Sequence, residues 1–474
     1  MNAGSLFGYR LVVTLTLLLA SGCVSGSPEG KPPLDDSAID SPVDSGSDSA
    51  SDSGPPDDTD PDTGPATLVL ITLDTFRADH IGEATPFLVA LAAEGLELPD
   101  LDTHSWTYPG IGAVVTGVHP TLWGIESWTF DREPDEMPYG LSPDIRTLAE
   151  ALGDLGWASA YWNSNPIAGD KSGLDRGYDR YIEFNEGATV TQVPAILAWL
   201  EENRGKPRFL HLHVNDAHSP YDLLHDACEA EVRALDDGTC RWDFVANNED
   251  SLFANNEVAD GRFAASSADY AACQSLLAAA YRCEVRKQDQ DLGEVWAELT
   301  ATGELEGALT VVAIDHGEGL LDPWTNHGFD LRGPVLDGWG ALHWPGRIAP
   351  GRLDLPLGQE DIVPTIASLL ALDLGMDTSG LPFEEVPADR VRTTFFGGPL
   401  ANLGSAWGHV RGAYDNEHRL IVDTRGTCSL YDLVADPTEQ NNLCGELAPP
   451  EHLVTATTEV ATITEGFAEE APRP

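Results

Sequence analysis

Two segments of the sequence place potential metal ligands directly after runs of apolar, largely β-branched residues. Asp74 follows the run at 67–73. Asp315 and His316 follow the run at 309–314. Such runs are typical of strands buried in a parallel sheet, and ligands of open α/β sheets bind beyond the carboxyl ends of the strands. Two carboxylates and an imidazole suit one divalent metal ion, with calcium or manganese favoured and zinc or magnesium as alternatives.

A single Asp after a strand has a simpler explanation, which is that it caps the following helix. For Asp74 alone this explanation would be preferred. Asp315 and His316 are more specific, because the two adjacent ligands precede Gly317, which permits a tight turn. The two segments together therefore favour a metal site.

The pattern around these segments predicts an α/β domain with a mostly parallel sheet sandwiched by helices. Apolar runs typical of buried strands occur at 67–73, 158–162, 209–214 and 309–314. Helical patterns lie between them, at 86–94, 145–155, 190–203 and 281–300. Residues 222–270, rich in Asn, Asp and Ala, have the composition of an insertion. We assign residues 66–389 to this domain.

A different pattern begins near residue 390. Short strand-like segments occur at 407–414, 419–423 and 429–431, and a helical pattern follows near 451–464. Strands in close succession favour antiparallel pairing. We expect residues 390–474 to form a small C-terminal subdomain with an antiparallel sheet and a helix.

The N-terminal residues 1–22 have the features of a signal peptide. Arg10 precedes an apolar run at 11–20, which is too short to span a bilayer. The run ends in Leu-Ala-Ser-Gly-Cys, which resembles a bacterial lipobox and makes Cys23 the expected lipidation site. An ordinary signal peptide with a chance Cys is the alternative. We expect an exported bacterial lipoprotein, anchored to the membrane by its lipid, at the outer membrane, the cell surface or in the periplasm.

Residues 23–65 follow the expected cleavage site and are rich in Asp, Ser, Pro and Gly. A segment of this composition can bury too little apolar surface to compensate for the conformational entropy lost on folding, and repulsion between like charges extends it. The sequence therefore predicts a disordered acidic linker between the lipid and the folded domain.

The whole chain is strongly acidic, with 26 Lys and Arg against 78 Asp and Glu and a formal net charge of −52. Such a surface repels nucleic acid at long range, so nucleic acid is excluded as a partner. It also disfavours highly sulfated polymers, unless a local basic patch surrounds the site.

Six cysteines remain when Cys23 is set aside. An even number in an exported chain favours disulfides, and the absence of a CxxC pair argues against a zinc site. Six cysteines allow fifteen pairings. The simplest expectation joins neighbours in sequence, as Cys228–Cys240, Cys273–Cys283 and Cys428–Cys444.

Several segments resemble, in the same order, the motifs of the sulfatase family within the alkaline phosphatase superfamily. They cover about residues 67–445 and are Leu73–His80, Trp106–Pro120, Phe209–Tyr221, Asp315–Gly328, Asp361–Thr365 and Leu430–Glu439. Each motif alone is a weak signal, and their common order makes the assignment specific. The resemblance implies the α/β fold of this superfamily, with the C-terminal sheet and helix.

The resemblance also implies roles for residues at matching positions. Asp74, Asp315 and His316 would bind one divalent metal ion, and Thr107 would be the nucleophile bound to that metal. A metal ion lowers the pKa of a hydroxyl that it contacts and so allows attack on sulfur or phosphorus near neutral pH.

Two histidines would act on the ester itself. His218 and His327 match family positions that contact the transferred group or protonate the leaving oxygen, and imidazole has a suitable pKa for that task. Either residue alone would be interpreted as a surface or core histidine. We interpret His104, His211 and His213 as structural residues.

The sequence departs from the sulfatase motif in its nucleophile segment. Sulfatases use a Cys or Ser that is oxidised to formylglycine and continue with Pro-Ser-Arg or a close variant. Here the corresponding residues are Thr107, Pro109, Gly110 and Ile111. Thr cannot become formylglycine, so no formylglycine is expected. Thr75 also replaces the second Asp of the family's Asp-Asp pair.

Three functions remain compatible with this pattern. Hydrolysis or transfer at phosphate mono- or diesters is favoured, because a Thr alkoxide can take a phosphoryl group and pass it to water. Hydrolysis of sulfate esters without formylglycine is the second. The third is a catalytically impaired, sulfatase-like binding lipoprotein, suggested by Gly110 and Ile111.

Overall fold

The computed structural model describes residues 66–123, 141–219, 221, 226–235, 268–320, 327–328, 331–399, 407–423 and 426–468. The expected signal peptide, Cys23 and the acidic linker lie outside these residues, and so does Cys240. Among the helices of the described part, none has both the length and the apolar content needed to cross a membrane.

The main sheet has eight strands in the order β5-β4-β6-β1-β7-β8-β2-β9. In chain order they are β1 (Thr67–Leu73), β2 (Leu96–Leu98), β4 (Ala158–Asn163), β5 (Arg180–Glu183), β6 (Arg208–Val214), β7 (Leu309–Ile314), β8 (Gly340–His343) and β9 (Gly351–Arg352). The first five in the sheet order are parallel, whereas β8 is antiparallel to both of its neighbours and β9 is parallel to β2. Two short strands outside this sheet, β3 (Leu101–Asp102) and β10 (Leu357–Gly358), pair with each other. The expectation of a mostly parallel sheet is confirmed.

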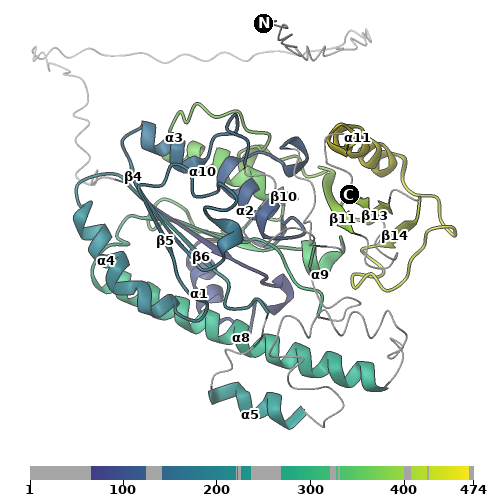
Figure 1. The fold of residues 1–474 in the computed structure, drawn as a ribbon, viewed down its shortest axis with the longest axis horizontal. Helices are drawn as coiled ribbons and strands as arrows, with labels where there is room; N and C mark the ends of the chain where they lie inside the picture. Colours follow the sequence, from purple (N-terminus) through teal and green to yellow (C-terminus); the bar gives the residue numbers. More distant parts are fainter. Residues whose placement is uncertain are drawn as a thin grey trace, which may run out of the picture. The chain divides into compact units, whose positions relative to one another are not determined.

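Helices cover both faces of the sheet (Figure 1). On one face Val69, Ile71 and Leu73 pack towards α1 (Pro86–Glu94), α4 (Val193–Glu202) and α8 (Ala268–Ala301). On the other face Leu68 and Leu70 pack towards α2 (Thr107–Thr116), α3 (Leu148–Asp154) and α10 (Ile362–Leu370). This alternation along β1 is the period of two that a strand imposes on its side chains. A core on each side explains why the strand is apolar apart from Thr67 and Thr72.

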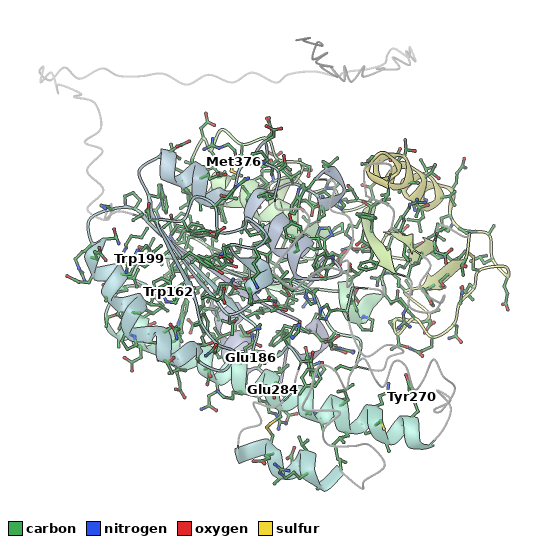
Figure 2. All side chains as sticks on the ribbon, viewed as in Figure 1. Trp162, Glu186, Trp199, Tyr270, Glu284 and Met376 are labelled. Atoms are coloured by element: carbon green, nitrogen blue, oxygen red, sulfur yellow. A yellow bond between two sulfur atoms is a disulfide. The ribbon has the colours of Figure 1, made fainter. Side chains whose placement is uncertain are left out.

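Aromatic side chains fix the packing of α4 on the sheet. Trp162 of β4 and Trp199 of α4 lie together in the core (Figure 2). Their rings meet edge to face with centroids 6.0 Å apart, an arrangement that aromatic pairs favour.

The remaining short elements connect these layers. They are α9 (Gly333–Leu336) and the 3-10 turns η1 (Ala78–His80), η2 (Pro120–Leu122), η3 (Pro166–Ala168), η4 (Thr189–Gln192), η5 (Gln359–Asp361) and η6 (Phe383–Glu385). Among them, η2 and η5 lie next to α2, the helix that begins at Thr107.

A second, antiparallel sheet contains the four strands β11 (Arg392–Pro399), β12 (Trp407–Tyr414), β13 (His418–Asp423) and β14 (Cys428–Asp432), in chain order. Helix α11 (Glu451–Ala468) packs on it through Leu453, which joins Leu420 and Leu430 in a small core. The expected sheet and helix are therefore confirmed. The strand β11 was not predicted.

The disulfides agree only in part with the expected pairing. Cys428–Cys444 is present. Cys228, on α5 (Asp226–Leu235), pairs with Cys283 on α8, so the expected pairs Cys228–Cys240 and Cys273–Cys283 are wrong. Cys273 is disulfide-bonded as well. It cannot pair with Cys283, because both lie on one continuous helix and ten residues of α-helix span about 15 Å, well beyond the Cα separation of a disulfide.

Candidate active site

The three predicted metal ligands come together at the carboxyl edge of the sheet. Leu73 of β1 pairs with Ile314 of β7, so the residues that follow the two strands meet. Asp74, Asp315 and His316 are completely buried, and one ligand atom from each lies within 4.8 Å of the others.

The pKa values of the two carboxyl groups are shifted in opposite directions. Burial and the negative charge of Asp74 raise the pKa of Asp315 well above its usual value. Burial also opposes ionisation of Asp74, but the hydrogen bond from His213 and the electrostatic effect of the surrounding histidines lower its pKa well below the usual value. A divalent cation would neutralise this pair of buried acids.

Asp315 also has an oxygen available for a ligand. Its Oδ1 accepts from the backbone N–H of Thr75 at 3.0 Å and of His316 at 2.6 Å. Its Oδ2 is buried and has no hydrogen-bond partner among the described residues. Buried acceptors are rarely left unpaired, so the donor set and the orphaned oxygen both fit a hard divalent ion.

Thr107 lies at this group, as the sequence predicted. It is the first residue of α2, after Trp106 in an extended conformation. Its Oγ1 is 3.2 Å from His316 Nε2 and 3.5 Å from Asp74 Oδ2. The first turn of a helix carries a partial positive charge, which stabilises negative charge developing on the hydroxyl oxygen.

Asn165 was missed by the sequence analysis. It follows β4, and its Nδ2 donates to Asp74 Oδ2 at 2.6 Å and to Thr107 Oγ1 at 3.4 Å. The signal that could have found it is Asn163-Ser164-Asn165, a polar run at the carboxyl end of a predicted strand. Asn165 connects the nucleophile candidate to a metal-ligand candidate.

The histidines that we interpreted as structural are found in different places. His213 Nε2 is 3.1 Å from Asp74 Oδ2, so this residue contacts the group directly. His211 lies behind it on the same strand, fully buried. His104 lies elsewhere, 3.8 Å from Glu360.

His218 and His327 lie beside the metal-ligand candidates. The ring of His327 is 4.2 Å from the ring of His316 and 5.4 Å from that of His218, measured between centroids. His218 Nδ1 donates to the backbone carbonyl of Ser219 at 2.5 Å, which leaves Nε2 as the nitrogen available to a substrate. The structure therefore brings together all six residues that the sequence predicted for the site.

Glu318 supports His327. Its buried carboxylate is 3.4 Å from His327 Nδ1 and accepts a hydrogen bond from the Tyr221 hydroxyl at 3.1 Å. Burial lowers the pKa of His327, but the adjacent Glu318 outweighs it and raises the pKa above its usual value. Glu318 lies in the motif Asp315–Gly328, but no role for it was predicted from the sequence.

The departures from the family motif have local structural reasons. A Cβ on Gly110 would lie 2.6 Å from the Asp315 carbonyl oxygen, so α2 can approach the strand end only with glycine there. Ile111 is completely buried in the apolar core, where no charged side chain would be solvated. Thr75 has φ of 55°, and its Oγ1 donates to Asp74 Oδ1 at 2.7 Å. Thr75 thus orients one carboxylate instead of adding another.

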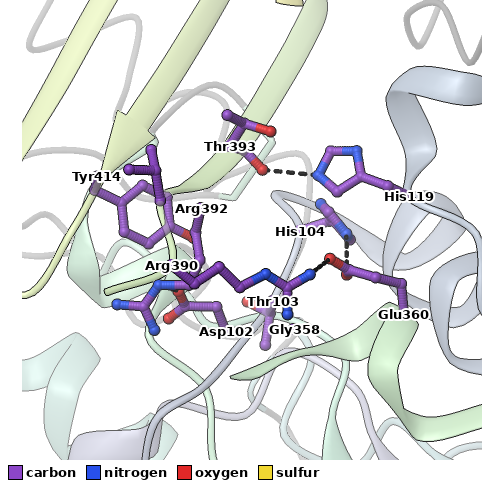
Figure 3. A pocket seen from close by; sticks show the side chains of 11 residues that line it. Asp102, Thr103, His104, His119, Gly358, Glu360, Arg390, Arg392, Thr393 and Tyr414 are labelled. Atoms are coloured by element: carbon purple, nitrogen blue, oxygen red, sulfur yellow. Dashed lines mark hydrogen bonds and ion pairs between the residues drawn. The ribbon is translucent and has the colours of Figure 1, made fainter. Parts of the chain in front are cut away.

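A separate polar pocket lies where the main domain meets β11 (Figure 3). There His119 Nε2 donates to the backbone carbonyl of Thr393 at 2.9 Å, and Glu360 accepts from Arg390 at 2.9 Å. Burial lowers the pKa of His119 to about 4. These groups pair across the boundary between the two sheets. The pocket therefore lies at the junction of the two sheets and is separate from the group around Asp74.

Comparison with known proteins agrees with the resemblance seen in the sequence. The family model named Sulfatase matches residues 66–372. An endo-4-O-sulfatase of Bacteroides thetaiotaomicron is 27% identical over 173 residues, which is 35% of this chain but only 29% of that relative. The chain thus matches less than a third of the length of this curated relative.

Two solved structures share the fold over most of the chain. One is a 4S-sulfatase of glycosaminoglycan metabolism in Bacteroides thetaiotaomicron, with a TM-score of 0.62, 18% identity, and coverage of 85% of this chain and 97% of the other. The second is a phosphonate monoester hydrolase from Silicibacter pomeroyi, with a TM-score of 0.62, 16% identity, and coverage of 85% and 96%. One fold therefore serves enzymes named for sulfate and for phosphonate esters.

Proposed function

Because this chain belongs to the sulfatase family, we propose that it is a metal-dependent ester hydrolase in which Thr107 is the nucleophile. We propose further that it acts on phosphate mono- or diesters, by hydrolysis or transfer, in preference to sulfate esters. The observation that carries this proposal is the position of the Thr107 hydroxyl, within 3.5 Å of both Asp74 and His316.

Asp74, Asp315 and His316 would hold one divalent ion, calcium or manganese by preference, which when bound would polarise the ester oxygen and lower the pKa of the Thr107 hydroxyl. The protein's own part is to place the hydroxyl at the start of α2 and to hold it there through Asn165. Preorganised groups of this kind supply a large share of catalysis, because they need no rearrangement during the reaction.

The reaction would occur in two displacements. Thr107, having lost its hydroxyl proton to solvent, would bond through Oγ1 to phosphorus while the ester oxygen leaves with a proton from His327, which Glu318 holds near the site. Water would then attack the phosphothreonine and give a proton to His218, and the Thr107 oxygen would leave as the alkoxide with which the cycle began. Passage of that proton from His218 to the neighbouring His327 would restore both histidines, so that one water is consumed and the alcohol and the phosphate are released.

The side chain of Thr107 favours phosphate over sulfate. A Thr carries a methyl group on Cβ and cannot be oxidised to the aldehyde that formylglycine requires. A phosphoryl group on a Thr hydroxyl can be released to water without an aldehyde. The strongly acidic chain, with a net charge of −52, also disfavours highly sulfated polymers.

The ester preference can be measured with purified protein freed of metal and then supplied with calcium, manganese, zinc or magnesium. We expect 4-nitrophenyl phosphate or bis(4-nitrophenyl) phosphate to be cleaved faster than 4-nitrophenyl sulfate. Thr107→Ala should lower kcat by several orders of magnitude. Thr116→Ala is the matched control, because Thr116 is buried at the other end of α2 and its hydroxyl donates to the Gly112 carbonyl.

The two alternatives give different results in the same assay. Faster cleavage of the sulfate ester would overturn the phosphoester proposal. The absence of turnover with every metal, together with unchanged metal binding in Thr107→Ala, would support a sulfatase-like binding lipoprotein. That alternative is motivated by Gly110 and by Ile111, which stands where the family motif has an Arg and is completely buried.

We propose that the protein is exported and anchored to the membrane through a lipid on Cys23, with residues 23–65 as the linker. The support is the short apolar run and the lipobox-like segment that ends at Cys23. Cells grown with a labelled fatty acid should incorporate label into the wild-type chain and not into Cys23→Ser. Equal labelling of both would contradict this anchor.

A further inference from the structure

A line of hydrogen bonds leads from Asp74 across β1 and β6 to Tyr178. His213 Nε2 is 3.1 Å from Asp74 Oδ2, and His213 Nδ1 is 2.8 Å from Thr72 Oγ1. The same Thr72 oxygen is 3.0 Å from His211 Nε2. His211 Nδ1 is in turn 2.8 Å from the hydroxyl of Tyr178, which is partly exposed. We call this line of five residues the Asp74–Tyr178 chain.

The pleat of the sheet explains why these residues meet. Thr72 on β1 and Asp74, which directly follows β1, are two residues apart and share a face, and His211 and His213 do so on β6. The register pairs Thr72 with His213, so Thr72 lies between the two imidazoles. Leu70, before Thr72 on that face, belongs to the apolar core, so the chain is a polar line in an otherwise apolar layer.

For neutral imidazoles, the direction of every hydrogen bond in the Asp74–Tyr178 chain follows from its Asp74 end. Asp74 is surrounded by donors, because the Thr75 hydroxyl donates to Oδ1 and the Asn165 amide donates to Oδ2. An ionised carboxylate only accepts, so His213 must carry a proton on Nε2 and donate it. In a neutral imidazole Nδ1 is then an acceptor, and it receives the hydroxyl proton of Thr72.

The same reasoning continues to the outer end. Thr72 has a single hydroxyl proton and has given it to His213, so it accepts from His211 Nε2–H. His211 Nδ1 then accepts from the Tyr178 hydroxyl. The ring of His211 is also stacked on Tyr161, with centroids 4.2 Å apart and planes 6° apart, which prevents it from turning to another partner. With neutral imidazoles, one arrangement of protons satisfies all four hydrogen bonds.

We propose that His213 is a positioning residue for Asp74, and that Thr72, His211 and Tyr178 act through it by fixing its Nε2–H tautomer. This inference rests on the proposed function, in which Asp74 is a metal ligand. Residues that do not bind the metal but hydrogen-bond to a metal ligand hold the side chain of that ligand in place. Loss of such a hydrogen bond typically lowers the metal affinity about 10- to 100-fold. Nothing in the proposal requires His213 or His211 to touch the substrate.

The first test measures the tautomer in metal-free protein, independently of activity. Nitrogen NMR of protein labelled in its histidine rings should show His213 and His211 as neutral imidazoles protonated at Nε2. In Thr72→Val the two rings lose their common partner, so the resonances of both should shift. A His213 signal protonated at Nδ1 and bare at Nε2 would overturn the proposal.

The second test measures the affinity for Mn²⁺ and Ca²⁺ by calorimetry. His213→Leu should weaken binding by about 10- to 100-fold, whereas His213→Gln, which keeps an N–H donor, should recover most of the loss. Thr72→Val removes one link and should weaken binding by less than His213→Leu. Thr310→Val is the matched control, because Thr310 is buried on β7 and its hydroxyl has no hydrogen-bond partner among the described residues.

The two tests separate this proposal from the proposed function. Wild-type affinity in both His213→Leu and Thr72→Val would overturn the positioning role even if the enzyme is active. An equal loss in Thr310→Val and Thr72→Val would mean that the effect is one of packing, and would also overturn it. If the wild-type protein bound none of the metals, the proposed metal site would be wrong. The nitrogen resonances would still show in which direction the hydrogen bonds of the Asp74–Tyr178 chain run.

Discussion

The Thr107 hydroxyl lies within reach of two metal-ligand candidates and one amide donor. Its neighbours Asp74, His316 and Asn165 come from three different strand ends. Asp74 and His316 were predictable, because each belongs to a motif directly after a long apolar run. Asn165 was not, because a lone Asn before a Pro has many other uses in a turn. Residues with a role only through a tertiary contact leave little trace in one sequence.

Replacement of Asn165 tests whether its amide group supports Asp74 and Thr107 in the site. In Asn165→Ala both Asp74 and Thr107 lose a donor, so we expect kcat to fall about 10- to 100-fold with a smaller change in KM. Steady-state kinetics on a chromogenic phosphate ester measure both constants. Asn203→Ala is the control, since Asn203 is also buried but donates to the Trp199 carbonyl at the end of α4. Equal losses of kcat in the two variants would contradict a role for Asn165 in the site.

At the scale of elements, the long central strands were predictable, and the short strands towards one edge of the sheet were not. β1, β6 and β7 are six or seven residues long, rich in apolar residues and completely buried, which is a strong pattern. β2 and β9 have three and two residues, too few for any period to show. The Cys228–Cys283 disulfide joins two cysteines that are 55 residues apart in sequence and lie on different helices, so it depends on the packing of the helices and not on the spacing of the cysteines.

The junction in Figure 3 gives a prediction for stability against pH. His119 is neutral in the folded protein, because Nε2 donates to the Thr393 carbonyl and Nδ1 accepts from the Thr121 N–H. Burial lowers its pKa to about 4, although the charge of Glu360 raises it and the nearby His104 and Arg390 lower it. The unfolded chain takes up a proton at about pH 6.5 and the folded chain does not.

The free energy of unfolding should therefore fall as the pH drops from about 6.5 to about 4. Protonation of His119 in the unfolded chain should account for about 2 kcal/mol of this loss at about pH 4.5. Urea unfolding at about pH 7 and about pH 4.5 measures it. His119→Gln keeps a donor but has no proton to gain, so it should lose less stability on acidification than the wild type. His418→Gln, on β13 away from the junction, should behave as the wild type does. The same acid sensitivity in His119→Gln would contradict this assignment.

At the scale of the whole molecule, the order of the motifs along the chain was the most informative feature of the sequence. Five of the six motifs lie at the end of a strand of the main sheet or at the start of a helix that covers it, and the sixth, Leu430–Glu439, begins in β14 of the second sheet. Their order therefore specifies the fold and the site together. The net charge of −52 is a second property of the whole chain. It repels anionic substrates over distances set by the ionic strength.

This charge leads to a prediction for the kinetics. Raising the ionic strength from about 0.01 M to about 0.15 M shortens the screening length from about 30 Å to about 8 Å, so kcat/KM for an anionic ester should rise. The rise should be larger for a phosphate monoester dianion than for a diester monoanion. Measurements of kcat/KM at several salt concentrations test this, with kcat as the internal control, because saturation removes the encounter step. A fall in kcat/KM for both esters would indicate a basic approach to the site.

The central claim, that Thr107 is the nucleophile, is tested most directly by trapping the covalent intermediate. Protein with bound metal is mixed with a ³²P-labelled phosphate ester, quenched in acid within one turnover and digested, and the labelled peptide is sequenced. We predict phosphate on Thr107 and none in Thr107→Ala, whereas Thr116→Ala should label as the wild type does. Label on another residue, or label from a ³⁵S-sulfate ester in place of the phosphate ester, would contradict the account.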